Sequence, residues 1–133
     1  MNPAPPTPAT TVTTTIDTPY ERCVAFLANA REHHRWATSF IASQRELDGR
    51  LWVSTPLGEL LYRVEGDQER GLLQILAGDL PPFEVRVVPN GRGCDVQFLL
   101  RRRPDQEDDT FAQDRANLRD ELDLLRRLLE GDR

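Results

Sequence analysis

The chain has 133 residues, of which 38% are hydrophobic and 29% are charged, and it carries a formal charge of −5. A chain of this size builds one core that buries roughly two thirds of the unfolded surface, so we expect one domain. Binding to nucleic-acid phosphates requires clustered cations in excess of carboxylates, so this composition argues against a nucleic-acid partner. No apolar run reaches the roughly 20 residues of a membrane span, and the N-terminus lacks a secretory signal, so we expect a cytoplasmic protein without a membrane span.

The N-terminal segment divides into a tail and a strand. Residues 1–9 contain prolines at positions 3, 5, 6 and 8. Proline supports neither a helix interior nor a sheet ladder, so this segment is predicted to be a disordered tail. Residues 10–133 are the predicted single domain. Within it, Thr11–Ile16 is rich in β-branched residues, with Val12 and Ile16 on one side, and is predicted to be the first strand.

Two short helices are predicted directly after this strand. Thr18, Pro19 and Glu21 have the spacing of a capping box, with Thr18 as the N-cap and proline at the first helical position. Apolar residues then follow at helical spacing as far as Asn29, which is the predicted end. A second, polar helix is predicted over Ala30–Trp36.

Six further strands are predicted where the periodicity becomes alternating. Turn sequences such as Asp48-Gly49 and Asn90-Gly91 separate them, and short loops of this kind join sequential antiparallel neighbours, which predicts a meander. The best-patterned strands have one apolar face, which indicates a sheet covered on one side only. The predicted strands are Phe40–Leu47, Leu51–Thr55, Glu59–Glu65, Leu72–Ala77, Phe83–Val88 and Cys94–Arg101.

One long amphipathic helix, Asp108–Glu130, is predicted to close the chain and to cover the apolar face of the sheet. Asp114 and Arg115 interrupt the N-terminal half of its apolar stripe, so its first turns could face a wetter environment. The fold class is therefore α+β, with the order β-α-α-β6-α and a curved antiparallel sheet around the C-terminal helix. The stripe itself consists of Phe111, Leu118, Leu122, Leu125 and Leu129.

The polar residues carry no catalytic signature. His33 and His34 are adjacent on a helix and point about 100° apart, so they cannot both bind one metal ion, and we expect no metal site. A short polar helix normally exposes its histidines, which disfavours a general-base role. Cys23 and Cys94 are predicted to be buried reduced thiols. Neither a nucleophile elbow nor a phosphate-binding glycine motif occurs, so we expect no nucleotide cofactor.

Three segments together resemble a known superfamily. They are Ile16-Asp17-Thr18-Pro19 leading into the first helix, the second helix ending at Arg35-Trp36, and Val96-Gln97-Phe98-Leu99-Leu100 followed by the closing helix. In this arrangement the chain resembles the START-like, Bet v 1-like (SRPBCC) superfamily, in particular its polyketide cyclase/dehydrase-like branch, which has the helix-grip fold. The resemblance implies a cavity between sheet and closing helix that holds lipids, polyketides or other apolar molecules.

We therefore expect the protein to bind a small hydrophobic ligand in that cavity. One alternative is a cyclase- or dehydratase-like enzyme, in which Asp114, Arg115 and Tyr62 would contact the substrate; ion pairs within the helix are the simpler role for the first two. Another alternative is a protein-interaction module with a filled core, and a homodimer is expected if its exposed apolar residues form one patch. The expected ligand-binding residues are Trp36, Trp52, Tyr62, Phe98, Phe111, Asp114, Arg115 and Leu118.

Overall fold

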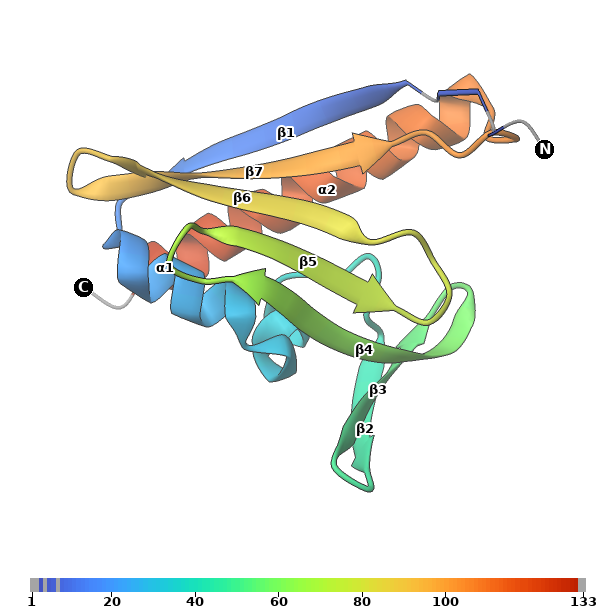
Figure 1. The fold of residues 1–133 in the computed structure, drawn as a ribbon, viewed down its shortest axis with the longest axis horizontal. Coiled ribbons are helices and arrows are strands. Elements are labelled where there is room, and N and C mark those ends of the chain that lie inside the picture. The colour runs from blue at the N-terminus through green and yellow to red at the C-terminus, as the bar shows by residue number, and fades with distance from the viewer. Residues whose placement is uncertain (1–2, 4, 7, 132–133) are drawn as a thin grey trace.

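A curved sheet of seven antiparallel strands forms the centre of the molecule, with its helices on one face (Figure 1). The computed structural model describes residues 3, 5–6 and 8–131. The strands are β1 (Ala9–Ile16), β2 (Ser43–Leu47), β3 (Arg50–Thr55), β4 (Gly58–Asp67), β5 (Leu72–Ala77), β6 (Phe83–Asn90) and β7 (Gly93–Arg101). Their order in the sheet is β1-β7-β6-β5-β4-β3-β2, so the predicted six-stranded meander is confirmed and β1 pairs with its last strand.

The proline-rich tail predicted for residues 1–9 lies partly outside the described residues, which omit 1–2, 4 and 7. Strand β1 begins at Ala9, two residues before the predicted start, because Ala9 still pairs with Arg101 at the end of β7. The backbone N–H of Arg102 also donates to the carbonyl of Pro8 (3.0 Å). The disorder of the tail and the domain boundary at residue 10 stay predictions.

The alternating sequence of the strands sorts their side chains onto two faces. Val12, Val85 and Phe98 lie at paired positions of β1, β6 and β7 and are buried, so they mark the inner face. The outer face carries the charged and polar residues between them. The Asp48-Gly49 turn joins β2 to β3 with φ angles of 53° and 76°, the two positive values that a two-residue hairpin turn requires.

The first helix, α1 (Tyr20–Ala28), corrects the predicted capping box. Pro19 is the N-cap, and its carbonyl accepts from the backbone N–H of Cys23 (3.1 Å). Thr18 therefore lies one position too early to cap, and its buried hydroxyl has no hydrogen-bond partner within residues 3, 5–6 and 8–131. The predicted end at Asn29 is confirmed, and the side chain of Asn29 accepts from Arg31 N (3.3 Å) to start the 3-10 helix η1 (Ala30–Arg35).

The segment 40–42 is not part of a strand, contrary to the prediction for Phe40–Leu47. The backbone N–H groups of Phe40 and Ile41 both donate to the carbonyl of Ala37, at 3.1 and 2.8 Å. The chain therefore makes a further turn after η1, and Ile41 is buried in the core instead of joining the ladder. Strand β2 begins only at Ser43.

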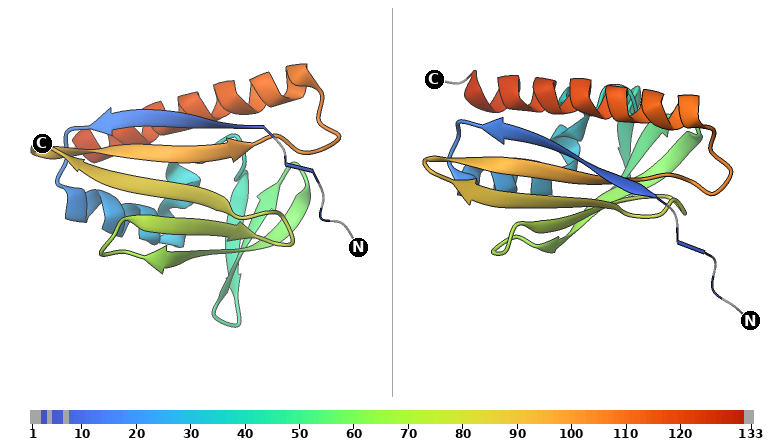
Figure 2. Two further views of the ribbon diagram at one scale, coloured as in Figure 1. Left: turned by 45° about the horizontal axis from the view of Figure 1, so that its top comes forward. Right: turned by 90° about the horizontal axis from the view of Figure 1, so that it is seen from above.

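The last helix, α2 (Asp108–Glu130), has the predicted bounds. It begins beyond the end of β7 and runs back along β1 and β7 on the inner side of the sheet (Figure 2). It does not cover the inner face alone, because α1 and η1 contact β6, β7 and β4. Among the residues that the structure describes, no helix combines the length and the apolar character needed to cross a membrane.

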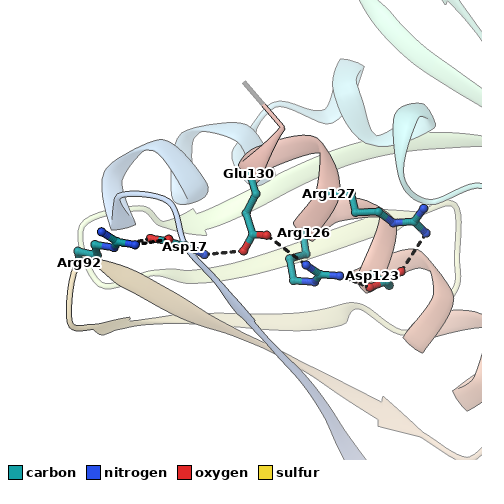
Figure 3. A network of polar contacts seen from close by, with 6 residues as sticks. All are labelled: Asp17, Arg92, Asp123, Arg126, Arg127 and Glu130. Carbon is teal, nitrogen blue, oxygen red and sulfur yellow. Dashed lines mark hydrogen bonds and ion pairs between the residues drawn. The ribbon is translucent and has the colours of Figure 1, made fainter. Parts of the chain in front are cut away.

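A polar network fixes the C-terminal end of α2 to the start of α1 (Figure 3). The carboxylate of Glu130 accepts from the backbone N–H of Asp17 (2.9 Å) and pairs with Arg126 (3.1 Å). Asp17 pairs with Arg92 in the β6–β7 turn (2.7 Å), and Asp123 pairs with Arg126 (2.7 Å). Helix α2, the β6–β7 hairpin and the β1–α1 junction are thus joined at this end of the molecule.

Candidate functional site

The predicted ligand-binding residues separate into three environments. One group is buried in the centre of the core, one residue lies on the outer face of the sheet, and the rest follow the N-terminal half of α2. Arg115 and Asp114 are half-buried there, and Leu118 is 9% exposed. The core group is Trp36, Tyr62 and Phe98, and the outer-face residue is Trp52. The residues along α2 are Phe111, Asp114, Arg115 and Leu118.

Trp36 lies at the centre of the inner space. It is 2% exposed, and its ring packs against Phe98 (centroids 5.7 Å apart) and against His33 (4.9 Å). Its indole Nε1–H is buried and has no hydrogen-bond acceptor among the residues that the structure describes. A buried donor without an acceptor costs about 1–3 kcal/mol, so this group is suited to an acceptor from a bound molecule or a water.

His33 is fully buried, which corrects the prediction that it faces solvent. Its Nε2 lies 2.7 Å from the carbonyl of Leu27, and because a carbonyl only accepts, Nε2 carries the proton. Its Nδ1 then accepts from the Tyr62 hydroxyl (2.5 Å). Burial lowers the pKa of His33 to about 4. Both ring nitrogens are occupied, so His33 connects α1, η1 and β4 and has no free nitrogen for base catalysis.

Glu121 is a buried carboxylate that the sequence analysis did not single out. Its Oε2 accepts from the backbone N–H of Ser39 (3.1 Å), and burial raises its pKa to about 7. Burial, and next the charge of Glu121, raise the pKa of Tyr62. The signal was present in the spacing, because Glu121 comes three residues after Leu118 and four before Leu125 and so lies on the buried side of the helix.

Trp52 does not line the space under α2. The β3–β4 register pairs it with Leu61, whereas Leu51 pairs with the buried Tyr62. Because successive residues of a strand point to opposite faces, Trp52 projects from the outer face while Leu51 is buried on the inner face. Its half-buried ring contributes to the outer surface of the β2–β4 region.

The two charged residues that interrupt the stripe of α2 have different surroundings. Asp114 accepts from the side-chain amide of Gln106 (2.6 Å) and lies 3.8 Å from the guanidinium of Arg103, so the β7–α2 connection engages it. Arg115 makes neither a hydrogen bond nor an ion pair with any described residue. In the described part of the chain, therefore, neither Asp114 nor Arg115 forms the ion pair within the helix that the sequence predicted.

An apolar rim, defined as Phe40, Phe83, Leu100 and Phe111, lies at the end of the sheet where α2 begins, and all four side chains are only half-buried. The rings of Phe40 and Phe83 are 5.9 Å apart. The β6–β7 register pairs Glu84 with Leu99, which brings Phe83 beside Leu100 on the inner face. Phe111 is in the first turn of α2, and the Arg102 guanidinium lies over its ring (5.8 Å).

Two surface depressions lie elsewhere. A shallow groove of about 530 Å³ crosses the outer face, where Leu72, Gln74 and Leu99 line it. A second, of about 550 Å³, lies between the α1–η1 junction and β3–β4 and is bordered by Arg31 and Arg50. Neither lies between the sheet and α2, where Trp36 and Phe98 occupy the middle of the space.

The cysteines agree with their prediction. Cys23 and Cys94 are both buried and reduced. Burial, followed by the proximity of Cys94, raises the pKa of the Cys23 thiol, so it stays protonated and is a poor nucleophile. Within the described residues, no three His, Cys, Asp or Glu side chains gather in an arrangement that could hold a metal ion.

No protein-family model and no curated protein matches this sequence. Solved structures share its fold. An uncharacterized protein from Bacillus thuringiensis is similar with a TM-score of 0.70 at 14% identity, over 92% of this chain and 98% of its own. The Aha1 dimer from Colwellia psychrerythraea has a TM-score of 0.68 at 12% identity, over 92% and 96%. DynU16, from the dynemicin biosynthetic locus, has a TM-score of 0.63 at 16% identity and covers 96% of this chain, which spans 49% of DynU16.

At these identities the likeness establishes the fold and nothing beyond it. The fold that this chain shares with them is its seven-stranded curved sheet with a long C-terminal helix on the inner side. Neither the ligands nor the assembly of those proteins is transferred to this chain by the comparison. A homodimer of this chain stays a prediction.

Proposed function

We propose that this protein is a START-like, helix-grip binding protein that holds a small apolar ligand at the apolar rim, against the N-terminal half of α2. This position is narrower than the cavity expected from the resemblance, because Trp36, Tyr62 and Phe98 belong to the core. The ligand would lie at the end of the inner space, with Leu118 as the first closed layer of side chains beneath it.

The uneven covering of the inner face carries this proposal. Toward the C-terminal half of α2 the core is closed: Ile16, Leu125 and Cys94 are completely buried. At the other end, Phe83 and Leu100 belong to the same face but remain half-exposed, as does Phe111 on the helix above them. Apolar side chains that are left half-exposed at the end of a curved sheet are a common setting of a small-molecule site.

Trp36 is connected to the rim through its neighbour Phe98. Its ring packs against Phe98, which is followed two residues later by Leu100 of the rim. Because Trp36 is 2% exposed, a ligand on the rim would affect it through Phe98 and not by direct contact. Trp36 would then report ligand binding through its fluorescence, and Trp52 on the outer face would not.

The enzyme alternative has lost two of its three residues. Asp114 is engaged by Gln106, and the Tyr62 hydroxyl donates to His33. A cyclase or dehydratase requires convergent groups that are free to move protons. Of the three, only Arg115 has no partner among the described residues, and a guanidinium does not release its proton near neutral pH. Binding without chemistry is therefore the better-supported proposal, and a polyketide-like molecule is one candidate ligand class.

The test uses N-phenyl-1-naphthylamine, an uncharged probe that becomes fluorescent in apolar surroundings. Phe111→Asp places a charge at the rim, where it should weaken probe binding about tenfold or more, since an ionised carboxylate resists transfer into an apolar site. Leu72→Asp is the matched control, because Leu72 is 44% exposed on the outer face and lines the groove there.

The two variants separate the proposal from the interaction-module alternative. Loss of binding in Phe111→Asp with retention in Leu72→Asp supports the rim. The reverse result would place the apolar binding surface on the outer face of the sheet and overturn the proposal. Absence of probe binding to the unmodified protein would overturn it as well.

A further inference from the structure

Arg115 occupies a position of α2 where the packing pattern calls for an apolar residue. Phe111, Arg115 and Leu118 follow one another at spacings of four and three, and the same spacing continues through the buried leucines toward the C-terminus. The arginine therefore belongs to the stripe that faces the sheet, and it is half-buried. Removing part of a guanidinium from water without a partner anion is unfavourable.

The helix itself offers Arg115 no anion. Side chains three or four residues away are its neighbours on a helix, and these positions hold Phe111, Ala112, Leu118 and Arg119. The preceding residue, Asp114, is engaged by Gln106 and Arg103.

Other half-buried arginines show what this fold normally provides. Arg102 pairs with Asp108 and donates to the carbonyl of Gln106 (3.1 Å), and Arg126 pairs with both Asp123 and Glu130. Among the described arginines that are half-buried, Arg115 alone has neither a hydrogen bond nor an ion pair. Arg119 is also unpaired among the described residues, but it is exposed, so its guanidinium stays hydrated and has no comparable desolvation cost.

We propose that Arg115 binds the carboxylate of an apolar carboxylic acid whose hydrocarbon body lies on the apolar rim. This inference rests on the proposed function and specifies the ligand class. The guanidinium presents paired N–H donors whose geometry matches the two oxygens of a carboxylate, and partial exclusion of water strengthens such a pair. Arg102 also lies beside the rim, but it is paired with Asp108, so among the described residues Arg115 is the cation there that is left without a partner. A single unpaired cation beside an apolar surface fits a ligand with one anionic group and an apolar remainder.

The experiment compares decanoate, decan-1-ol and decylamine, which share a chain and differ in head group, by displacement of N-phenyl-1-naphthylamine. We expect decanoate to bind at least about tenfold more tightly than decanol, and decylamine to bind most weakly, because charge-assisted pairs with arginine are strong. Arg115→Leu should remove the preference for decanoate while decanol binding is retained. Arg115→Lys, which keeps the charge without the paired donors, should retain part of the preference.

Arg119→Leu is the matched control, since it removes the same charge from an exposed position one turn further along α2. Retention of the decanoate preference in this variant supports a local role for Arg115. Equal binding of decanoate and decanol to the unmodified protein, or an equal loss in both leucine variants, overturns the inference while leaving the proposed function in place. If none of the three compounds displaces the probe but the probe itself binds, the inference also fails; if the probe does not bind, the proposed function fails.

Discussion

The two halves of α2 use the same hydrophobic spacing for different purposes. From Leu122 to Leu129 the stripe is closed, with α2 in contact with β1, and the polar network of Figure 3 holds the helix end to the Asp17 backbone. From Phe111 to Arg115 the stripe is half-exposed, and the charge of Arg115 has no ion-pair partner in the described part of the chain. The closed half therefore contributes most to stability, and the half-exposed half contains the proposed binding site.

Under the proposed function, this difference lets a single helix be both a core element and the wall of a binding site. A fixed C-terminal half positions the first turns over the rim without requiring them to bury their own side chains. Sites that must bind other molecules are drawn from the less stable parts of a structure. The comparison predicts that substitutions after Leu118 mainly lower stability, whereas substitutions before it mainly affect ligand binding.

The largest expected effect is on stability at the closed end. Leu125 is completely buried, so Leu125→Ala should lower the free energy of unfolding by about 2–5 kcal/mol, through lost apolar contact and the cavity left behind. Phe111→Ala, which removes a larger but half-exposed side chain, should cost only about 1 kcal/mol. Urea unfolding measures the free energy of unfolding of both variants, and an unchanged m-value would show that they unfold to the same extent as the unmodified protein. Equal losses would show that the two halves are packed alike.

The pH dependence of stability should locate the boundary between the halves, where Glu121 lies. Its pKa is raised from 4.5 to about 7, so the folded state holds the proton more tightly. Its favourable contribution is present below pH 4.5 and is lost as the pH rises to 7. The Glu121→Gln variant lacks this loss. The free energy of unfolding of the variant minus that of the unmodified protein should therefore rise by about 1–3 kcal/mol between pH 4.5 and 7 and then stay constant.

His33 produces the opposite slope, because its pKa is lowered from 6.5 to about 4 and its contribution is lost as the pH falls through that interval. The two slopes offset each other between pH 4.5 and 6.5 in the unmodified protein, and Glu121→Gln exposes that of His33. Asp105→Asn, at an exposed position of the β7–α2 connection, is the control. A difference between Glu121→Gln and the unmodified protein that does not vary with pH would contradict the burial of Glu121.

The sequence predicted the elements well because their signals are local. The bounds of α2 and β5 follow from apolar periodicity and flanking turns, and Asp48-Gly49 specifies its own hairpin. The errors concern contacts between distant segments. His33 is buried because Leu27 and Tyr62 together satisfy its ring, and Tyr62 lies 29 residues away. A pattern confined to a short polar helix contains no sign of that partner.

The candidate site shows the same division. That Arg115 interrupts an apolar stripe could be read from the sequence, whereas the engagement of Asp114 by Gln106 depends on how the β7–α2 connection folds. The sequence does not distinguish the inner from the outer face at Trp52, because its neighbours in β3 are both apolar and the strand does not alternate there. The register with β4 decides the matter, and register is a property of the assembled sheet.

The smallest expected effect tests whether Arg115 lowers the stability of the ligand-free protein by interrupting its apolar packing. Arg115→Leu completes the apolar stripe between Phe111 and Leu118, so it should increase the free energy of unfolding by about 0.5–1 kcal/mol in the absence of ligand. Arg119→Leu adds an equal apolar surface at an exposed position and should leave stability within about 0.5 kcal/mol. Thermal and urea unfolding of ligand-free protein measure both. A loss of stability in Arg115→Leu would mean that the arginine already makes a favourable contact in the ligand-free protein. A gain in stability together with weaker decanoate binding would mean that Arg115 serves ligand binding and not the stability of the core.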